Sequence, residues 1–170
     1  DLIRASTNIE SRPSPPVGIS QRRLTFTADK KFPGLQGPRH WLQSSPDGSR
    51  IAFLMKDAAG IVQFWTISPN GGAPTQLTHN HWSVASAFTW SPDGRELAYV
   101  MDNSIFVTDT ATGRSRRVTE RTADEIAPRP EACVFSLDGN KIAFVRRKKS
   151  DGVEANQICV VFFQAKNSIK

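Results

Sequence analysis

The stretch 45–53 reads SPDGSRIAF, and the chain returns to this pattern as SPDGRELAY at 91–99 and as SLDGNKIAF at 136–144. The aspartates of the three copies lie 46 and 45 residues apart. A period of this length, with a turn followed by an alternating apolar run, is typical of β-propeller blades. Proline presets the backbone of such a turn, and glycine supplies the left-handed residue that ends it.

The repeat predicts an all-β fold, a β-propeller with about three four-stranded antiparallel blades that form an incomplete ring. The repeats lie near 39–78, 85–119 and 129–161. We expect a flexible Pro-rich linker over 1–20, propeller blades over 21–161 and an atypical tail over 162–170. We interpret the tail as a truncation or an altered reading frame, and a natural end capped by a partner strand is the alternative.

Second strands, buried on both faces, are expected over 50–56, 96–101 and 141–147. A Leu-Thr or Val-Thr pair closes each unit, and Leu24-Thr25 predicts an outermost strand over 22–27. This strand of one copy would complete the last blade of another copy in a head-to-tail dimer. An incomplete ring otherwise leaves open strand edges, which predicts self-association.

The chain carries 22 Lys and Arg against 16 Asp and Glu among its 170 residues, a formal net charge of +6. The basic clusters at 22–23, 114–117 and 146–149 fall at strand ends and turns, which favours solvated hairpins. No base-stacking motif accompanies them, so nucleic acid is not an expected partner, whereas an acidic glycan is an alternative one. The sequence shows no signal peptide and no run near the roughly 18 apolar residues of a membrane helix. We expect a soluble protein without a membrane partner, either cytoplasmic or periplasmic.

The only two cysteines, Cys133 and Cys159, are expected on the first and third strands of one blade. Two strand spacings are roughly 9–10 Å. This separation exceeds the ~7 Å reach of a disulfide. Both thiols are therefore expected to be free and structural.

The repeat, followed by Gln76-Leu77-Thr78, resembles the WD40-like repeats of TolB and of the propellers of prolyl-oligopeptidase-type peptidases. The segments PRHWL at 38–42 and IAFLMKD at 51–57 resemble more specifically the YidR-like family of bacterial proteins with a TolB-type propeller. The resemblance implies the propeller fold and a chain that corresponds to the C-terminal half of a longer propeller. It implies no activity, because that family has none assigned.

The three histidines are the best candidates for metal ligands. His79 and His81 lie in the loop between two predicted blades, and His40 lies just before an inner strand. Such connections share one face of a propeller, so we expect these imidazoles to converge there. With Gln76 or Asp29 as a further ligand, they would hold a divalent metal ion.

The same face offers a candidate ligand patch. Its predicted binding residues are Arg39, His40, Trp41 and Trp82. We expect Trp82 to be exposed beside a histidine, whereas Trp65 and Trp90 alternate with buried strand positions and are expected in the core.

No catalytic residue is assigned. The turn aspartates Asp47, Asp93 and Asp138 recur too regularly for catalysis, and the sequence contains no nucleophile elbow, zincin motif or phosphate loop. The leading hypothesis is a protein- or ligand-binding scaffold without catalysis of its own, with a protein or peptide on the loop face. The first alternative is a metal-assisted lyase or hydrolase on acidic oligosaccharides, since some propeller lyases carry a His-rich metal site. The second is a truncated product without independent function.

Overall fold

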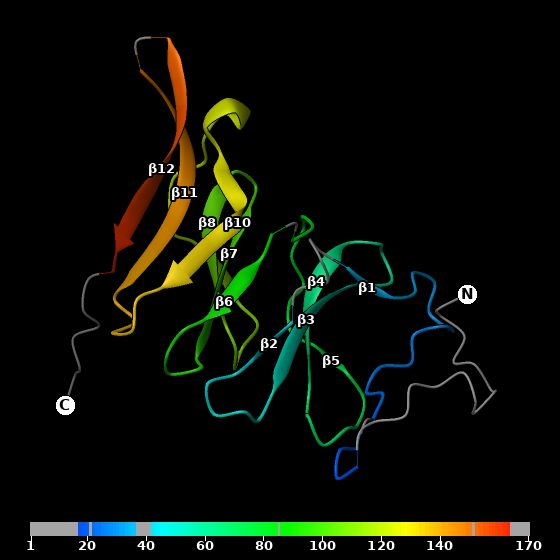
Figure 1. The fold of residues 1–170 in the computed structure, drawn as a ribbon. Coiled ribbons are helices and arrows are strands. Elements are labelled where there is room, and N and C mark those ends of the chain that lie inside the picture. Colours follow the sequence, from blue (N-terminus) through cyan, green and yellow to red (C-terminus); the bar gives the residue numbers. More distant parts are fainter. Residues whose placement is uncertain (1–16, 21, 37–41, 85, 151, 164–170) are drawn as a thin grey trace.

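Three antiparallel sheets follow one another along the chain, as the repeat predicted (Figure 1). The computed structural model describes residues 17–20, 22–36, 42–84, 86–150 and 152–163. Blade 1 comprises β1 (Leu35–Gln36), β2 (Gln43–Ser44), β3 (Ile51–Lys56), β4 (Val62–Ile67) and β5 (Thr75–Gln76). Blade 2 comprises β6 (Phe88–Trp90), β7 (Glu96–Met101), β8 (Ser104–Asp109) and β9 (Ser115–Arg117). Blade 3 comprises β10 (Pro128–Phe135), β11 (Lys141–Ser150) and β12 (Val153–Phe162).

The all-β, open propeller is therefore confirmed. The part of the chain that the structure describes contains one short 3-10 helix, η3 (Asp124–Ile126), in the connection between blades 2 and 3. No described helix is long and apolar enough to cross a membrane. The order β6-β7-β8-β9 in blade 2 gives the four-stranded pattern without interruption.

The repeated turn has the same hydrogen bonds in each blade. In blade 1, Gly48 has φ +69° and its amide donates to the Ser45 carbonyl oxygen at 2.8 Å. The Ser45 hydroxyl donates to Asp47 Oδ1 at 2.5 Å and accepts the Arg50 amide at 3.0 Å. The equivalent hydroxyls donate to the turn aspartates of blades 2 and 3 at 2.6 and 2.5 Å. These hydrogen bonds confirm the prediction that the three aspartates form turns.

Neighbouring blades pack through apolar faces. The core between blades 1 and 2 includes Leu54 and Phe64 from one blade and Phe88 and Tyr99 from the next, all at most 1% exposed. The Phe64 ring meets the rings of Phe88 and Tyr99 edge to face, with centroids 4.9 and 4.8 Å apart. Burial of apolar area stabilises such an interface by roughly 25 cal/mol per Å². A second cluster joins blades 2 and 3 in the same way.

The segment before β1 contributes Leu24 to the other face of blade 1. Leu24 and Leu35 pack there against Phe53 and Met55, which are 1 and 2% exposed. Residues 22–27 form no strand, contrary to the prediction of an outermost strand. The predicted strand needs the third strand of another blade as its partner; in the described chain Leu24 packs instead on the apolar face of blade 1.

The inner strand of blade 1 is divided into two short strands. β1 and β2 both pair with the same edge of β3, Leu35 opposite Met55 and Ser44 opposite Ile51. β3 and β7 are each six residues long and pair with a third strand of six residues. In blade 3 the corresponding strands, β11 and β12, are each ten residues long. The hairpin of blade 3 therefore extends beyond the predicted ends of its strands (Figure 1).

The ends of the chain are described only in part. Residues 1–16 of the expected linker and 164–170 of the expected tail lie outside the described residues. Phe162 belongs to β12, and the Phe163 amide donates to the Asn140 carbonyl oxygen at 2.8 Å. The Phe163 ring lies 6.3 Å from that of Phe135. The first two residues of the tail thus continue blade 3.

The two cysteines occupy the predicted strands. Cys133 on β10 and Cys159 on β12 each lie opposite Phe144 on the intervening strand β11. Both thiols are free, as predicted. Burial raises the pKa of the Cys133 thiol from 9.0 to about 12, so this sulfur remains protonated near neutral pH.

Candidate functional site

The antiparallel order divides the connections between two ends of the blades. The loop face, as we call one end, holds residues 57–61, 77–84, 102–103 and 118–127 and the end of the β11–β12 hairpin. The opposite end, the turn face, holds the repeated turns at 45–50, 91–96 and 136–141 and the hairpins between third and fourth strands. His79, His81 and Trp82 of the predicted site belong to the loop face.

A buried amide network anchors the loop 77–84. The side chain of Gln63 on β4 is fully buried, and its Oε1 accepts the Thr78 hydroxyl at 2.8 Å and the Asn80 amide at 3.0 Å. Its Nε2 donates to the Asn80 carbonyl oxygen at 2.9 Å and to Asp57 at 3.2 Å. Buried polar groups that are fully paired hold a single backbone arrangement. The residues that follow Thr78 are therefore fixed in position.

The closing threonine of the repeat now has a structural explanation. Thr78 Oγ1 accepts the Phe64 amide at 2.9 Å, and Thr119 Oγ1 accepts the Ile105 amide at 3.0 Å. Just beyond the end of the fourth strand, each threonine hydroxyl thus accepts the hydrogen bond of a third-strand amide in place of a backbone carbonyl oxygen. β5 and β9 each end two residues before these threonines.

The predicted ligands of the loop face come together in pairs. Gln76 Nε2 and His79 Nδ1 lie 3.1 Å apart, and the His81 and Trp82 rings meet edge to face with centroids 6.1 Å apart. Both histidines are exposed. Among the described residues, no three His, Cys, Asp or Glu side chains are grouped closely enough to hold a metal ion.

Three members of the predicted patch cannot be placed. Arg39, His40 and Trp41 lie outside the described residues, so convergence of His40 with the other histidines stays a prediction.

The predicted exposure of Trp82 and burial of Trp90 are confirmed, whereas Trp65 lies at the margin of the core rather than within it. The side chain of Trp82 is 55% exposed, whereas Trp90 is buried and its Nε1 donates to the Gln43 carbonyl oxygen at 3.2 Å. Trp65 is half-buried and donates to the Met55 carbonyl oxygen at 3.0 Å. Indole donors that enter a core require such partners.

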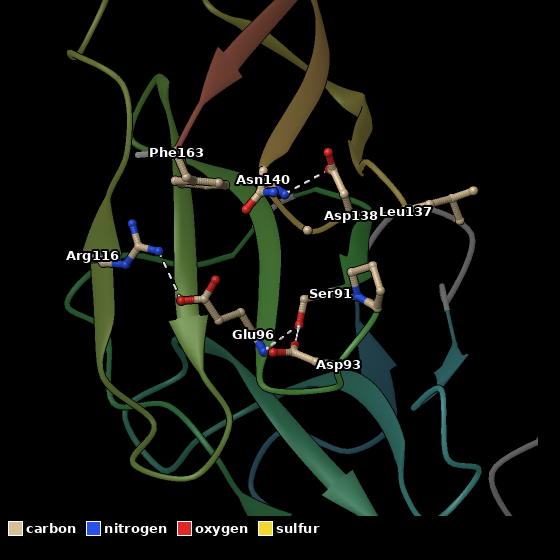
Figure 2. A pocket seen from close by; sticks show the side chains of 10 residues that line it. Ser91, Asp93, Glu96, Arg116, Leu137, Asp138, Asn140 and Phe163 are labelled. Atoms are coloured by element: carbon tan, nitrogen blue, oxygen red, sulfur yellow. Dashed lines mark hydrogen bonds and ion pairs between the residues drawn. The ribbon is translucent and has the colours of Figure 1, made fainter. Parts of the chain in front are cut away.

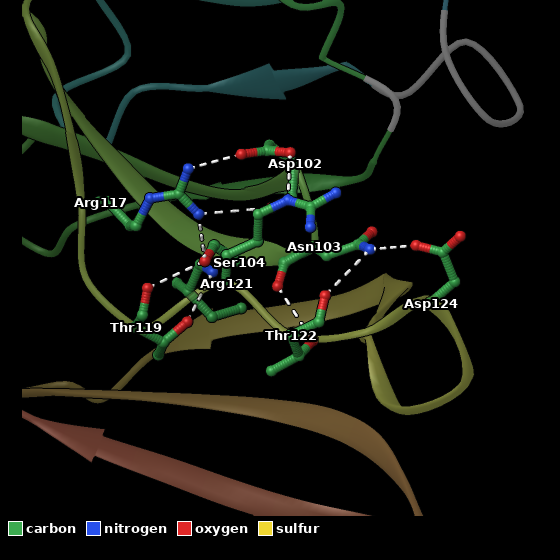
Figure 3. Close-up of polar contacts among 9 residues, drawn as sticks. Asp102, Asn103, Ser104, Arg117, Thr119, Arg121, Thr122 and Asp124 are labelled. Carbon is green, nitrogen blue, oxygen red and sulfur yellow. Dashed lines mark hydrogen bonds and ion pairs between the residues drawn. The ribbon is translucent and has the colours of Figure 1, made fainter.

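A second polar cluster on the loop face surrounds the β7–β8 turn (Figure 3). Asp102 accepts hydrogen bonds from Arg121 at 2.8 Å and from Arg117 at 2.5 Å. These two guanidinium groups hold the pKa of the Asp102 carboxyl below its ordinary value. Asp102 and Asn103 have φ of +45° and +52°, the left-handed backbone of a two-residue hairpin turn. This cluster is not among the predicted site residues, although an Asp-Asn pair between two apolar runs favours a turn, since both residues tolerate the left-handed backbone.

A hollow of about 340 Å³ lies beside this cluster. It is lined by residues that include Ser83, Asp102, Asn103, Asp124, Arg129 and Arg147. One of the lining residues, Ser83, belongs to the same loop as the exposed Trp82 and follows it directly in the chain. Charges of both signs line its walls, which suits a polar ligand segment beside an apolar anchor.

The turn face carries a larger cleft of about 710 Å³ between blades 2 and 3 (Figure 2). Arg116 donates to Glu96 at 3.0 Å on one wall, and its guanidinium lies 5.2 Å from the centre of the Phe163 ring. At the equivalent junction of blades 1 and 2, Arg50 crosses to the Gly94 carbonyl oxygen at 3.2 Å. In the repeat of blade 2, Glu96 stands at the position that Arg50 holds in blade 1. The junction of blades 2 and 3 therefore lacks an arginine at this position, and the cleft lies there.

The turn aspartates on this face behave as structural anions. The Ser45 hydroxyl, followed by the amide and hydroxyl of Ser49, lowers the pKa of Asp47 from 3.8 to about 2. The Ser136 hydroxyl and Lys141 lower the pKa of Asp138 in the same direction. Carboxylates with depressed pKa values are poor general acids or bases near neutral pH.

The comparisons with known proteins agree with this architecture. The model of the dipeptidyl peptidase IV (DPP IV) N-terminal region matches residues 61–168. The uncharacterized protein YidR of Escherichia coli (strain K12) is 48% identical over 134 residues, 78% of this chain and 32% of that protein. The chain thus spans about a third of the length of this curated relative. The predicted resemblance to part of a longer YidR-like protein is confirmed.

Solved structures are also similar in fold to this chain. The putative TolB from Agrobacterium tumefaciens aligns with a TM-score of 0.52 and 27% identity, over 70% of this chain and 40% of that one. An oligogalacturonate lyase in complex with manganese aligns with a TM-score of 0.54 and 20% identity, over 71% of this chain and 35% of that one. At this identity the second likeness concerns the fold alone.

Proposed function

Because the chain belongs to the family of the dipeptidyl peptidase IV N-terminal region, we propose that it is a propeller-type binding module that captures a protein or peptide segment on its loop face. The module would need no catalysis of its own. Trp82 would be the apolar anchor, and the hollow that Ser83 lines and the Asp102 cluster would supply polar contacts to the bound segment.

The observation that carries this proposal is the position of Trp82. A large aromatic side chain that is 55% exposed stands on a loop fixed by the fully buried Gln63. A rigid aromatic group buries much area on binding at little entropic cost, which is why tryptophan is enriched among the dominant residues of interfaces. His81 beside the indole restricts it further and adds a hydrogen-bonding edge.

The test uses the 170-residue chain, immobilised and panned against a phage library of random linear peptides. Selected peptides are then measured by fluorescence anisotropy with the unaltered chain and with Trp82→Ala. We expect the variant to bind roughly tenfold or more weakly, since truncation of a central aromatic residue is worth about 2 kcal/mol or more.

The matched control is Phe26→Ala, which removes another exposed aromatic side chain outside the loop face. It should leave the affinity unchanged. Equal affinity of Trp82→Ala and the unaltered chain, or an equal loss in both variants, would contradict the proposal.

The alternative proposal is a metal-assisted lyase or hydrolase on acidic oligosaccharides. Its support in the described residues is the contact between Gln76 and His79, two of its four proposed ligands. Titration of the chain with manganese(II) in a calorimeter tests it without an assumption about the substrate. Binding that His79→Ala and His81→Ala each abolish would favour this alternative, and no heat of binding would remove it.

A further inference from the structure

On the turn face, an arginine closes the junction between blades 1 and 2. The Arg50 guanidinium donates to the Gly94 carbonyl oxygen at 3.2 Å, and to the hydroxyl and carbonyl oxygens of Thr110 at 3.4 Å each. It also lies 5.1 Å from the centre of the Trp90 ring. The Gly94 carbonyl oxygen accepts a second hydrogen bond, from the Thr110 hydroxyl at 2.9 Å. This place between two blades therefore holds a guanidinium through oxygen acceptors and an aromatic face.

The junction between blades 2 and 3 repeats the backbone of this place. The Thr110 amide donates at 2.8 Å to the carbonyl oxygen of the residue after Gly94, and the Phe163 amide donates at 2.8 Å to that of the residue after Gly139. Phe163 thus holds the place of Thr110, and Gly139 holds the place of Gly94. The two junctions can therefore be compared residue by residue.

The side chains of the second junction supply no donor to the glycine carbonyl oxygen. Glu96 stands in place of Arg50, and Phe163 stands in place of Thr110. A carboxylate and a phenyl ring cannot donate a hydrogen bond, so neither serves the Gly139 carbonyl oxygen as its counterpart does in the first junction. The cleft of about 710 Å³ lies here, and Glu96, Gly139 and Phe163 all line it (Figure 2).

Arg116 shows that the walls of this cleft accept a guanidinium. It donates to Glu96 at 3.0 Å, and its guanidinium lies 5.2 Å from the centre of the Phe163 ring. The side chain of Arg116 is 48% exposed, whereas that of Glu96 is 14% exposed. Arg116 therefore reaches in from the solvent side to a carboxylate held deeper in the wall, and the cleft stays hollow beside it.

The charges of the cleft favour a cation over an anion. Its lining carboxylates are Asp93, Glu96 and Asp138, and its lining base is Arg116. Basic side chains of the same turns already lie 3.9 Å from Asp93 and 2.9 Å from Asp138. Glu96 is therefore the carboxylate that a ligand would use, and an anion bound beside Arg116 would have to lie against these acids.

We propose that this cleft binds an arginine side chain of a partner polypeptide. The guanidinium would pair with Glu96 and the Gly139 carbonyl oxygen, with its flat face against Phe163. A planar cation with five N–H donors serves these acceptors together and stacks on a ring, which the compact ammonium of lysine does less well. The bound guanidinium takes the place of Arg116 on Glu96. The cleft lies at the opposite end of the blades from Trp82, so this proposal does not depend on peptide capture by the loop face.

The probe is the blocked tripeptide acetyl-Gly-Arg-Gly-amide, titrated into the isotopically labelled 170-residue chain and followed by amide chemical shifts. We expect saturable shifts at Gly139 and Asn140, which line the cleft. The matched peptide carries citrulline, which keeps the shape of arginine without its charge. It should bind about fivefold or more weakly, because charge-assisted hydrogen bonds are stronger than neutral ones.

Two substitutions should act in opposite directions. Glu96→Gln removes the carboxylate and should weaken binding of the arginine peptide about fivefold or more, whereas Arg116→Ala removes the internal competitor and should strengthen it. The matched control is Glu154→Gln, which also removes a carboxylate that is paired with an arginine, at 3.5 Å, but does so on β12 outside the cleft. It should leave the affinity unchanged.

Four results would overturn the proposal. They are an absence of saturable shifts at the cleft, equal affinity for the arginine and citrulline peptides, unchanged affinity in Glu96→Gln, and weaker binding in Arg116→Ala. The last result would instead mean that Arg116 itself binds the probe, as in an anion site. The comparison of the two peptides needs no substitution, so it holds even if a variant fails to fold.

Discussion

Gly113 stands where the outer hairpin of blade 2 touches the backbone of blade 1, and Gly113→Ala should be among the most damaging small substitutions in the chain. The residue has φ +71°, and a Cβ atom there would lie 1.9 Å from the Leu77 carbonyl oxygen. Real Cβ atoms do not approach backbone oxygen so closely. The two blades would have to separate, and with them the core around Phe64 and Tyr99.

The magnitude follows from a comparison with Gly48→Ala. Gly48 has φ +69° and no atom within 4 Å of a built Cβ, so its substitution carries only the backbone strain of about 1–2 kcal/mol. Gly113→Ala carries the same strain and an overpacking term of about 1–3 kcal/mol. In a domain of this size each kcal/mol corresponds to about 2–4 °C of melting temperature.

Thermal and urea unfolding of both variants, followed by far-UV circular dichroism, measures the difference. We expect Gly113→Ala to melt several degrees below Gly48→Ala, with an unchanged slope in urea. Equal melting temperatures would mean that blades 1 and 2 are not in contact at Leu77, and the reasoning on blade packing would fail.

Three further outcomes test the internal contacts. The folded-state pKa of Asp47 is depressed from 3.8 to about 2. Its ionised form therefore stabilises the fold above pH 3.8, and this contribution is lost as the pH falls through 2. Asp47→Asn should flatten the dependence of the unfolding free energy on pH in this window, as measured by urea unfolding. Thr78→Ala should destabilise the chain by about 1–3 kcal/mol in urea because it leaves the buried Phe64 amide unpaired, and Thr78→Ser should restore most of the loss. Ellman's reagent at pH 8 should modify Cys159 in the native chain and reach Cys133 only on unfolding, since burial raises the pKa of Cys133 to about 12.

The fold could be predicted because the turn repeat uses local chemistry. Ser45, Asp47 and Gly48 fix one turn by contacts within five residues, and the same letters recur at each blade. The segment 22–27 could not be predicted in this way. Its alternation suits a strand, but a strand also needs a partner edge, and only the folded chain shows that Leu24 packs on the apolar face of blade 1 instead.

The site could be predicted only in part, for a similar reason. The exposure of Trp82 follows from its place in a loop, and the sequence analysis anticipated it. The anchoring role of Gln63 could not be anticipated, because a glutamine in a strand gives no sign that its amide will meet a loop 15 residues away. The Asp102 cluster likewise joins residues of a turn and of the following connection, which become neighbours only when β8 and β9 pair.

The departures from the repeat indicate where function should be sought. Residues that recur in every blade, such as the turn serines and aspartates, are already engaged in turn formation and have few hydrogen-bonding sites left for a ligand. Positions that break the pattern are free of that constraint: Glu96 stands at the place of Arg50 and lines the cleft between blades 2 and 3, and Leu137 replaces a turn proline in blade 3. Trp82, in contrast, stands in a connection that the repeat does not specify, so a ligand can be recognised there without any change to the interfaces that hold the blades together.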